Sequence, residues 1–182
     1  MQGGLGVAPG QATLHGSIGL IAHLGDRGSV RAGAGGGLGP YKGGAETGTI
    51  STYPLSLGAD VTALSSGQNS LVATVDVQPP ISGRLHTPDF DTSEKARTMR
   101  GYAGVGYRHV WWQERKNPDG GSGPSRPVGA ITTSLGPELW YTASAYHSTS
   151  TRVGGAFSLM IEVRATALGE MFDCLGSKHG CE

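Results

Sequence analysis

The stretch ATLHGSIGLIAHL (residues 12–24) alternates apolar and polar side chains. The apolar parity holds Leu14, Ile18, Leu20, Ala22 and Leu24, and the polar parity holds Thr13, His15, Ser17, Gly19 and His23. A period of two predicts a β-strand with two unlike faces. The apolar face suits either the core of a soluble sheet or the lipid-facing side of a membrane barrel, since both environments select the same pattern.

The composition weighs against a well-packed soluble core. Of 182 residues, 32 are glycine and three are phenylalanine, and only 15% are charged, against about 25% in soluble domains. The 14 basic and 14 acidic residues cancel, so no overall field recruits nucleic acid or an anionic membrane surface. We therefore expect one domain with no nucleic-acid partner.

The chain shows no helical membrane span and no targeting segment. No run of 18 apolar residues occurs, and MQGGLGVAPG has neither the basic nor the apolar region of a signal peptide. An exported form would therefore already have lost its signal. Cys174 and Cys181 lie close together in the sequence, which predicts a short-range disulfide in an oxidising compartment.

Period-two alternation between turn clusters predicts about eight strands. Their ranges are 12–24, 29–39, 49–64, 69–78, 98–112, 128–136, 139–147 and 155–168. Most reach the roughly 9 to 11 residues that a tilted membrane strand needs. Pro137 in SLGPELW marks either a hairpin or a bulge in one long strand. The turns GDRG (25–28) and SSGQ (65–68) fall where a barrel counted from residue 12 should carry its long loops.

The charges within these strands lie on the parity opposite the apolar one. They are Arg31, Asp60, Asp76, Arg100, Arg108, Glu162 and Arg164. All four lysines fall outside the expected strands, namely Lys42, Lys95, Lys116 and Lys178. Arginine suits bidentate pairing with carboxylates in a confined space, and an eight-stranded barrel has room inside only for side chains. We therefore predict a charge network that fills the lumen, with small residues such as Gly104 and Gly106 beside the arginines.

Aromatic residues gather at the ends of the expected strands, as in the girdle of a membrane interface. They are Tyr53, Trp111, Trp112, Trp140 and Tyr141.

On these features, residues 12–168 resemble the small outer-membrane β-barrels of Gram-negative bacteria, of the OmpA-transmembrane, OmpX and OmpW type. The resemblance implies an all-β, antiparallel up-and-down transmembrane barrel in the outer membrane, with a plugged or narrow polar lumen. We expect the barrel domain over residues 1–170 and a tail over 171–182. Such barrels commonly end on an aromatic residue, whereas here Phe172 is followed by DCLGSKHGCE.

The expected role is a structural or surface-interaction barrel, or a narrow porin-like channel. Its expected partners are the lipid bilayer, lipopolysaccharide and a periplasmic or extracellular protein that meets the loops. The alternative is a soluble β-sandwich, such as a capsid or adhesin module. That alternative accounts for the alternation but not for the lack of lysines in the strands.

Chemical sites are few. RAGAGGGLGPYKGG lacks the Gly-Lys-Ser/Thr of a phosphate loop, and Cys174, His179 and Cys181 are one ligand short of a structural zinc site. We expect no metal and no cofactor. The enzymatic alternative uses His147, Ser148 and Glu162, which loosely resemble the His, Ser and Glu of a lipid A deacylase. Because neighbouring residues in a strand point to opposite faces, His147 and Ser148 do not naturally converge.

Overall fold

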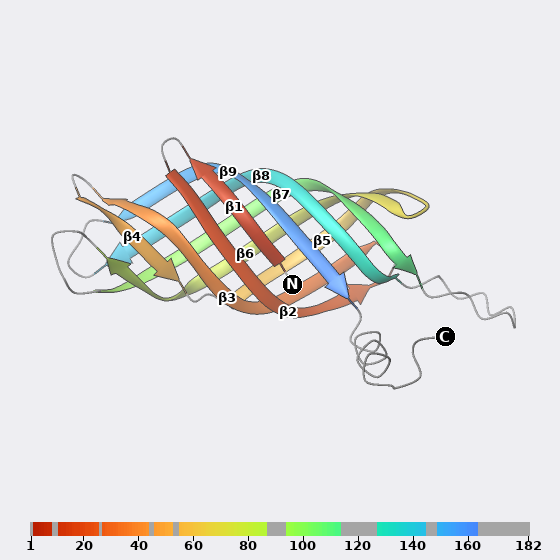
Figure 1. Ribbon diagram of the computed structural model, residues 1–182, viewed down its shortest axis with the longest axis horizontal. Coiled ribbons are helices and arrows are strands. Elements are labelled where there is room, and N and C mark those ends of the chain that lie inside the picture. The colour runs from red at the N-terminus through yellow and green to blue at the C-terminus, as the bar shows by residue number, and fades with distance from the viewer. Residues whose placement is uncertain are drawn as a thin grey trace, which may run out of the picture.

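The computed structural model describes residues 2–8, 11–25, 27–43, 46–52, 55–86, 94–113, 127–144 and 149–163. Within these ranges the chain forms nine β-strands (Figure 1). They are β1 (Gln2–Ala8), β2 (Gln11–Leu24), β3 (Gly28–Gly43), β4 (Glu46–Thr52), β5 (Leu55–Ser66), β6 (Asn69–His86), β7 (Glu94–Gln113), β8 (Pro127–Ser144) and β9 (Ser150–Val163). No helix that could cross a membrane occurs in these ranges.

The strands close into an antiparallel barrel. The pairings run β1–β2–β3–β5–β6–β7–β8–β9 and return from β9 to β1. The remaining described strand, β4, pairs with β3 and β6, the same neighbours as β5. The expected all-β antiparallel barrel is therefore confirmed, and its main circuit passes through eight of the nine described strands.

Three errors in the expected strand ranges turn eight expected strands into nine described ones. The single strand expected at 49–64 is wrong, because this part of the chain forms the two strands β4 and β5. The glycine-rich segment QGGLGVA forms β1, although it offers too little alternation to predict a strand. The separate strands expected at 128–136 and 139–147 are wrong, because β8 runs unbroken through Pro137. The missing N–H of Pro137 interrupts only the β7–β8 ladder, between Tyr102↔Glu138 and Val105↔Leu135, while the pairing with β9 continues at Pro137↔Gly155.

The additional strand β1 also explains the short turns. With β1 counted first, β2 and β5 run toward the end of the barrel at which β9 also ends, so the turns after β2 and β5 lie at the right of Figure 1. We call this the turn end, and the opposite end the cap end. Gly25 and Gly67 have φ angles of 66° and 61°, a left-handed conformation that glycine adopts at little cost in a tight turn.

The barrel narrows at the cap end. The pairing of β1 with β2 stops at Ala8↔Gln11, while β3, β4 and β6 to β9 extend further left in Figure 1. There the Ser150 hydroxyl donates to the Lys42 carbonyl at 2.7 Å, and Arg152 donates to the Pro40 carbonyl at 2.6 Å. These bonds join β9 directly to β3, so six strands surround this level.

The interior of this narrow level is apolar. Tyr41, Ile50, Leu85 and Ala96 form a buried cluster, which we call the cap core. In β3 and β7 these residues share the parity of Arg31 and Arg100. The interior therefore changes from charged to apolar along the barrel axis without a change of strand parity in β3 or β7.

Candidate functional site

The lumen is polar and the outer surface is apolar, the reverse of a water-soluble protein. In the described part of the chain, 26 large apolar side chains are exposed, and the buried side chains comprise 18 polar or charged residues and 11 apolar ones. In β2 the exposed parity runs from Leu14 to Leu24, whereas Thr13 and His15 are buried. The apolar face of residues 12–24 therefore points outward.

Arg31 lies at the centre of the lumen network. Its guanidinium lies 3.3 Å from the Asp60 carboxylate and 4.0 Å from Asp76, and it donates to Thr74 at 2.9 Å. A β-carbon at Gly58, its partner on β5, would come within 2.6 Å of the guanidinium. Glycine at this position leaves the guanidinium where it lies, whereas a β-carbon would force it to shift, as expected for bulky charges beside small residues in a narrow lumen.

Arg100 is the most enclosed charge, with 1% of its surface exposed. It lies 3.6 Å from the Asp76 carboxylate and donates from Nε to Glu138. Its guanidinium also lies 5.7 Å from the Tyr102 ring and 6.0 Å from the Trp140 ring. Two carboxylates and two aromatic rings therefore surround one cation away from water.

A separate pair lies toward the turn end. Arg108 donates to Glu162 at 2.5 Å, and the His23 ring lies 3.9 Å from the same carboxylate. Of the predicted network, only Arg164 lies outside the described residues. The structure thus places Arg31, Asp60, Asp76, Arg100, Arg108 and Glu162 in the lumen.

Glu138 belongs to this network but was missed from the sequence. It accepts from both Arg100 and the Thr13 hydroxyl. The expected hairpin at Pro137 left Glu138 outside both strands, so it could be assigned to neither face of the sheet. The unbroken strand puts it on the same face as Ser134 and Thr132. Arg152 was also missed, because it falls between the strands expected at 139–147 and 155–168. In the described part of the lumen, three arginines form ion pairs with four carboxylates, while Arg152 donates to the Pro40 carbonyl. The paired residues are Arg31, Arg100 and Arg108 with Asp60, Asp76, Glu138 and Glu162.

The aromatic prediction is wrong for Trp140. Its side chain is 5% exposed and points into the lumen beside Arg100, because it shares the parity of Glu138 in the continuous β8. Trp111, Trp112 and Tyr141 are exposed. The two tryptophans both face outward although they are neighbours, since the ladder is irregular between Val110 and Trp112. Tyr53 lies outside the described residues.

The lysine pattern also needs correction. Lys42 and Lys95 fall within β3 and β7, because both strands extend further than the alternation predicted. Both side chains are exposed, and both lie at the cap end, beyond the charged part of the lumen. Lys116 and Lys178 lie outside the described residues.

The catalytic alternative gains no support from Glu162. This carboxylate lies near the end of β9 and is paired with Arg108, whereas residues 147 and 148 precede the start of that strand in the sequence. Ser150 and Glu162 are separated by roughly 40 Å of extended strand. His147 and Ser148 themselves lie outside the described residues, as do Cys174 and Cys181, so the disulfide stays a prediction.

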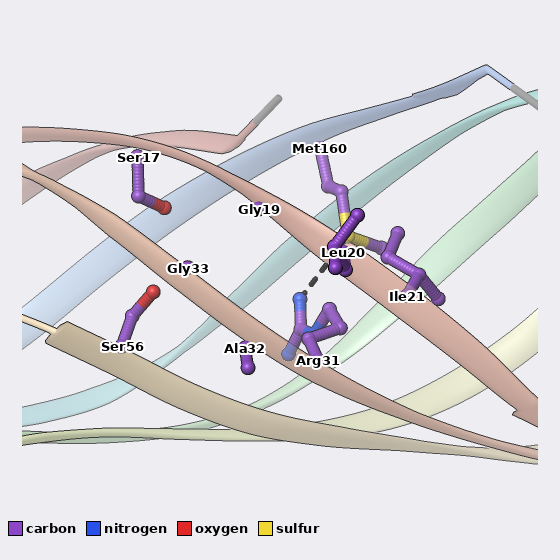
Figure 2. A pocket seen from close by; sticks show the side chains of 9 residues that line it. All are labelled: Ser17, Gly19, Leu20, Ile21, Arg31, Ala32, Gly33, Ser56 and Met160. Atoms are coloured by element: carbon purple, nitrogen blue, oxygen red, sulfur yellow. Dashed lines mark hydrogen bonds between the residues drawn. The ribbon is translucent and has the colours of Figure 1, made fainter. Parts of the chain in front are cut away.

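A small pocket lies beside Arg31, where small residues of β2, β3 and β5 leave space (Figure 2). Gly19, Gly33 and Ser56 line it, and Arg31 reaches across to the Met160 sulfur at 3.2 Å. Its free volume of about 20 Å³ holds about one water molecule. It offers no room for an organic substrate.

The described residues contain no group of three or more His, Cys, Asp and Glu side chains placed to hold a metal ion. The chain matches no protein-family model, no curated protein and no solved structure. The fold and the distribution of side chains are therefore the basis for a functional proposal.

Proposed function

We propose that this protein is a transmembrane β-barrel of an outer membrane, with a side-chain-filled lumen and a structural or surface-interaction role. One observation carries the proposal: among the described residues, 26 large apolar side chains are exposed, while Arg100 and all four carboxylates of the lumen are buried. Soluble monomers rarely expose apolar patches of more than a few hundred Å². A bilayer is the solvent that this surface fits.

The length of the apolar surface supports the same environment. In β9 the exposed apolar residues extend from Val153 to Val163, which spans roughly 33 Å of strand. At the usual tilt of about 40° this covers close to 25 Å along the membrane normal, the height of the apolar band in known membrane barrels. The same span separates Leu14 from Leu24 in β2.

A structural role is favoured over a channel. Arg31, Arg100 and their carboxylate partners occupy the middle of the lumen, and the cap core fills its narrow end. Because charged side chains already pair with one another, an ion would have to break these pairs to pass. A partner protein or a surface polysaccharide would therefore meet the loops rather than enter the barrel.

The direct test is refolding with and without detergent, followed by comparison of boiled and unboiled samples on a denaturing gel. We expect the chain to fold only in detergent and to change mobility on boiling, because the closed barrel resists the gel's detergent until heated. A soluble, monodisperse protein in plain buffer would overturn the membrane proposal. It would favour the soluble capsid or adhesin module instead.

A single outward substitution tests the environment of the wall. Leu135 is 66% exposed on β8, so arginine there should hardly affect a protein surrounded by water. In a bilayer, an arginine on the lipid face is expected to cost about 2 kcal/mol or more in free energy of unfolding. The measurement is urea unfolding in lipid vesicles.

Thr151→Arg is the matched control, since Thr151 is also exposed but lies nearer the cap end of the neighbouring β9. We expect it to change stability by less than about 0.5 kcal/mol. Equal stability of the Leu135→Arg and Thr151→Arg variants would argue that both positions face water.

A further inference from the structure

The outer face of the cap end carries a cluster of basic side chains. Arg84 and His86 on β6 and Lys95 and Arg97 on β7 are all exposed. We call these four residues the basic patch. Arg84 pairs directly with Lys95 in the antiparallel ladder. His86 lies two residues beyond Arg84 on β6, and Arg97 lies two residues beyond Lys95 on β7, so they flank this pair on opposite sides.

This arrangement is unfavourable for the barrel alone. Like charges directly opposite on neighbouring strands repel each other. In the part of the chain whose side chains are described, all four acidic residues, Asp60, Asp76, Glu138 and Glu162, are buried. None of the described ion pairs includes a residue of the basic patch. Among the side chains that the structure describes, no carboxylate therefore neutralises the basic patch, so the patch can attract an anion from outside the chain.

The position of the patch indicates where that anion lies. Arg97 is two residues from Met99, whose cross-strand partner is the exposed Tyr141. Beyond Met99, the outward positions of β7 are Ala103, Val105 and Tyr107. The patch thus borders the apolar wall, at the level where lipid headgroups would surround the barrel. The turn end carries less positive charge on its outer face: among the described residues there, Arg27 is the exposed arginine.

We infer that the basic patch binds the phosphate groups of anionic lipids in the leaflet around the cap end. The inference rests on the proposed membrane location and adds to it a lipid class and a leaflet. The planar guanidinium groups of Arg84 and Arg97 can each donate several N–H hydrogen bonds to phosphate oxygens. Lys95 lies beside both as a third cation. A bound phosphate relieves the repulsion between Arg84 and Lys95.

The test uses the barrel refolded in an uncharged, phosphate-free detergent, into which short-chain phosphatidic acid is titrated. We expect the thermal midpoint to rise by about 5 °C for the unchanged protein. We expect Lys95→Glu to fold equally well without lipid, because the new carboxylate faces Arg84, but to lose most of the rise. High salt should also remove most of it.

Arg27→Glu is the matched control, since it makes the same change of charge at the turn end and should keep the full rise. Three results would each overturn the inference: no rise in the unchanged protein, an equal rise in Lys95→Glu, or an equal rise with inorganic phosphate, which would indicate a general anion site. Failure of the membrane proposal is recognised separately, because the barrel would then fold without detergent before any lipid is added.

Discussion

Replacing Arg100 with methionine is expected to lower the free energy of unfolding by about 4 kcal/mol. Methionine fills much of the same space but leaves Asp76 and Glu138 buried without their common cation. It also removes the cation from between the Tyr102 and Trp140 rings. The measurement is urea unfolding in detergent, followed by the change in gel mobility of the folded barrel.

Two further variants show whether unpaired charge causes this loss. Adding Glu138→Gln to Arg100→Met should restore part of the stability. It removes the carboxylate whose described ion pair is with Arg100 alone, whereas Asp76 keeps Arg31 at 4.0 Å. Arg108→Leu should cost less than Arg100→Met, since Arg108 is 13% exposed in its side chain and water can reach Glu162 from the turn end. No rescue by Glu138→Gln, together with equal losses at both arginines, would contradict a charge network and indicate loss of packing alone.

Replacing Gly136 with alanine is expected to cost about 3 kcal/mol. A β-carbon there would lie 1.9 Å from the Ala103 carbonyl oxygen and 2.6 Å from the Gly104 α-carbon. Both neighbours are backbone atoms of β7, so the clash cannot be relieved by rotating a side chain. The two strands would have to separate, and urea unfolding in detergent measures the loss.

Gly155→Ala provides the control for the loss of a glycine. Gly155 lies on the neighbouring strand opposite Pro137, and a β-carbon there meets nothing within 4 Å. We expect a change of less than about 0.5 kcal/mol. Comparable losses in both variants would mean that chain flexibility, and not close approach of the strands, explains the glycine content.

The period-two pattern was sufficient to predict an all-β antiparallel barrel and most of the charged residues in its lumen. Arg31, Asp60, Asp76, Arg100, Arg108 and Glu162 could be placed inside because each follows the parity of a clearly alternating segment. The pattern failed where alternation is weak or interrupted. Glycines conceal the faces of β1, and Pro137 resembles a turn although it removes only one ladder bond. For that one reason Glu138 was left outside the expected strands, and Trp140 was predicted at the membrane interface.

The parts of β3, β6 and β7 that extend to the cap end could not be predicted from a pattern with apolar residues outside and polar residues inside. In β3, β6 and β7 the outward side chains change from apolar to basic, as at Lys42, Arg84 and Lys95, while the inward ones change to Tyr41, Leu85 and Ala96. This is the ordinary pattern of a water-soluble sheet. If each face of a strand is expected to keep one polarity along its whole length, these strands are predicted to end before they do.

The pairing of β1 with β9 has a consequence for how the molecule is made. It joins the first and last described strands, from Gln2↔Met160 to Val7↔Gly155, so every ladder but this one can form before the chain is complete. Until then β1 and β9 each present an open edge with unsatisfied backbone groups, which favours pairing with other chains. Before the chain closes, this open-edged sheet is the form most liable to associate with other chains, and the last ladder covers the edge of β9 from Gly155 to Met160.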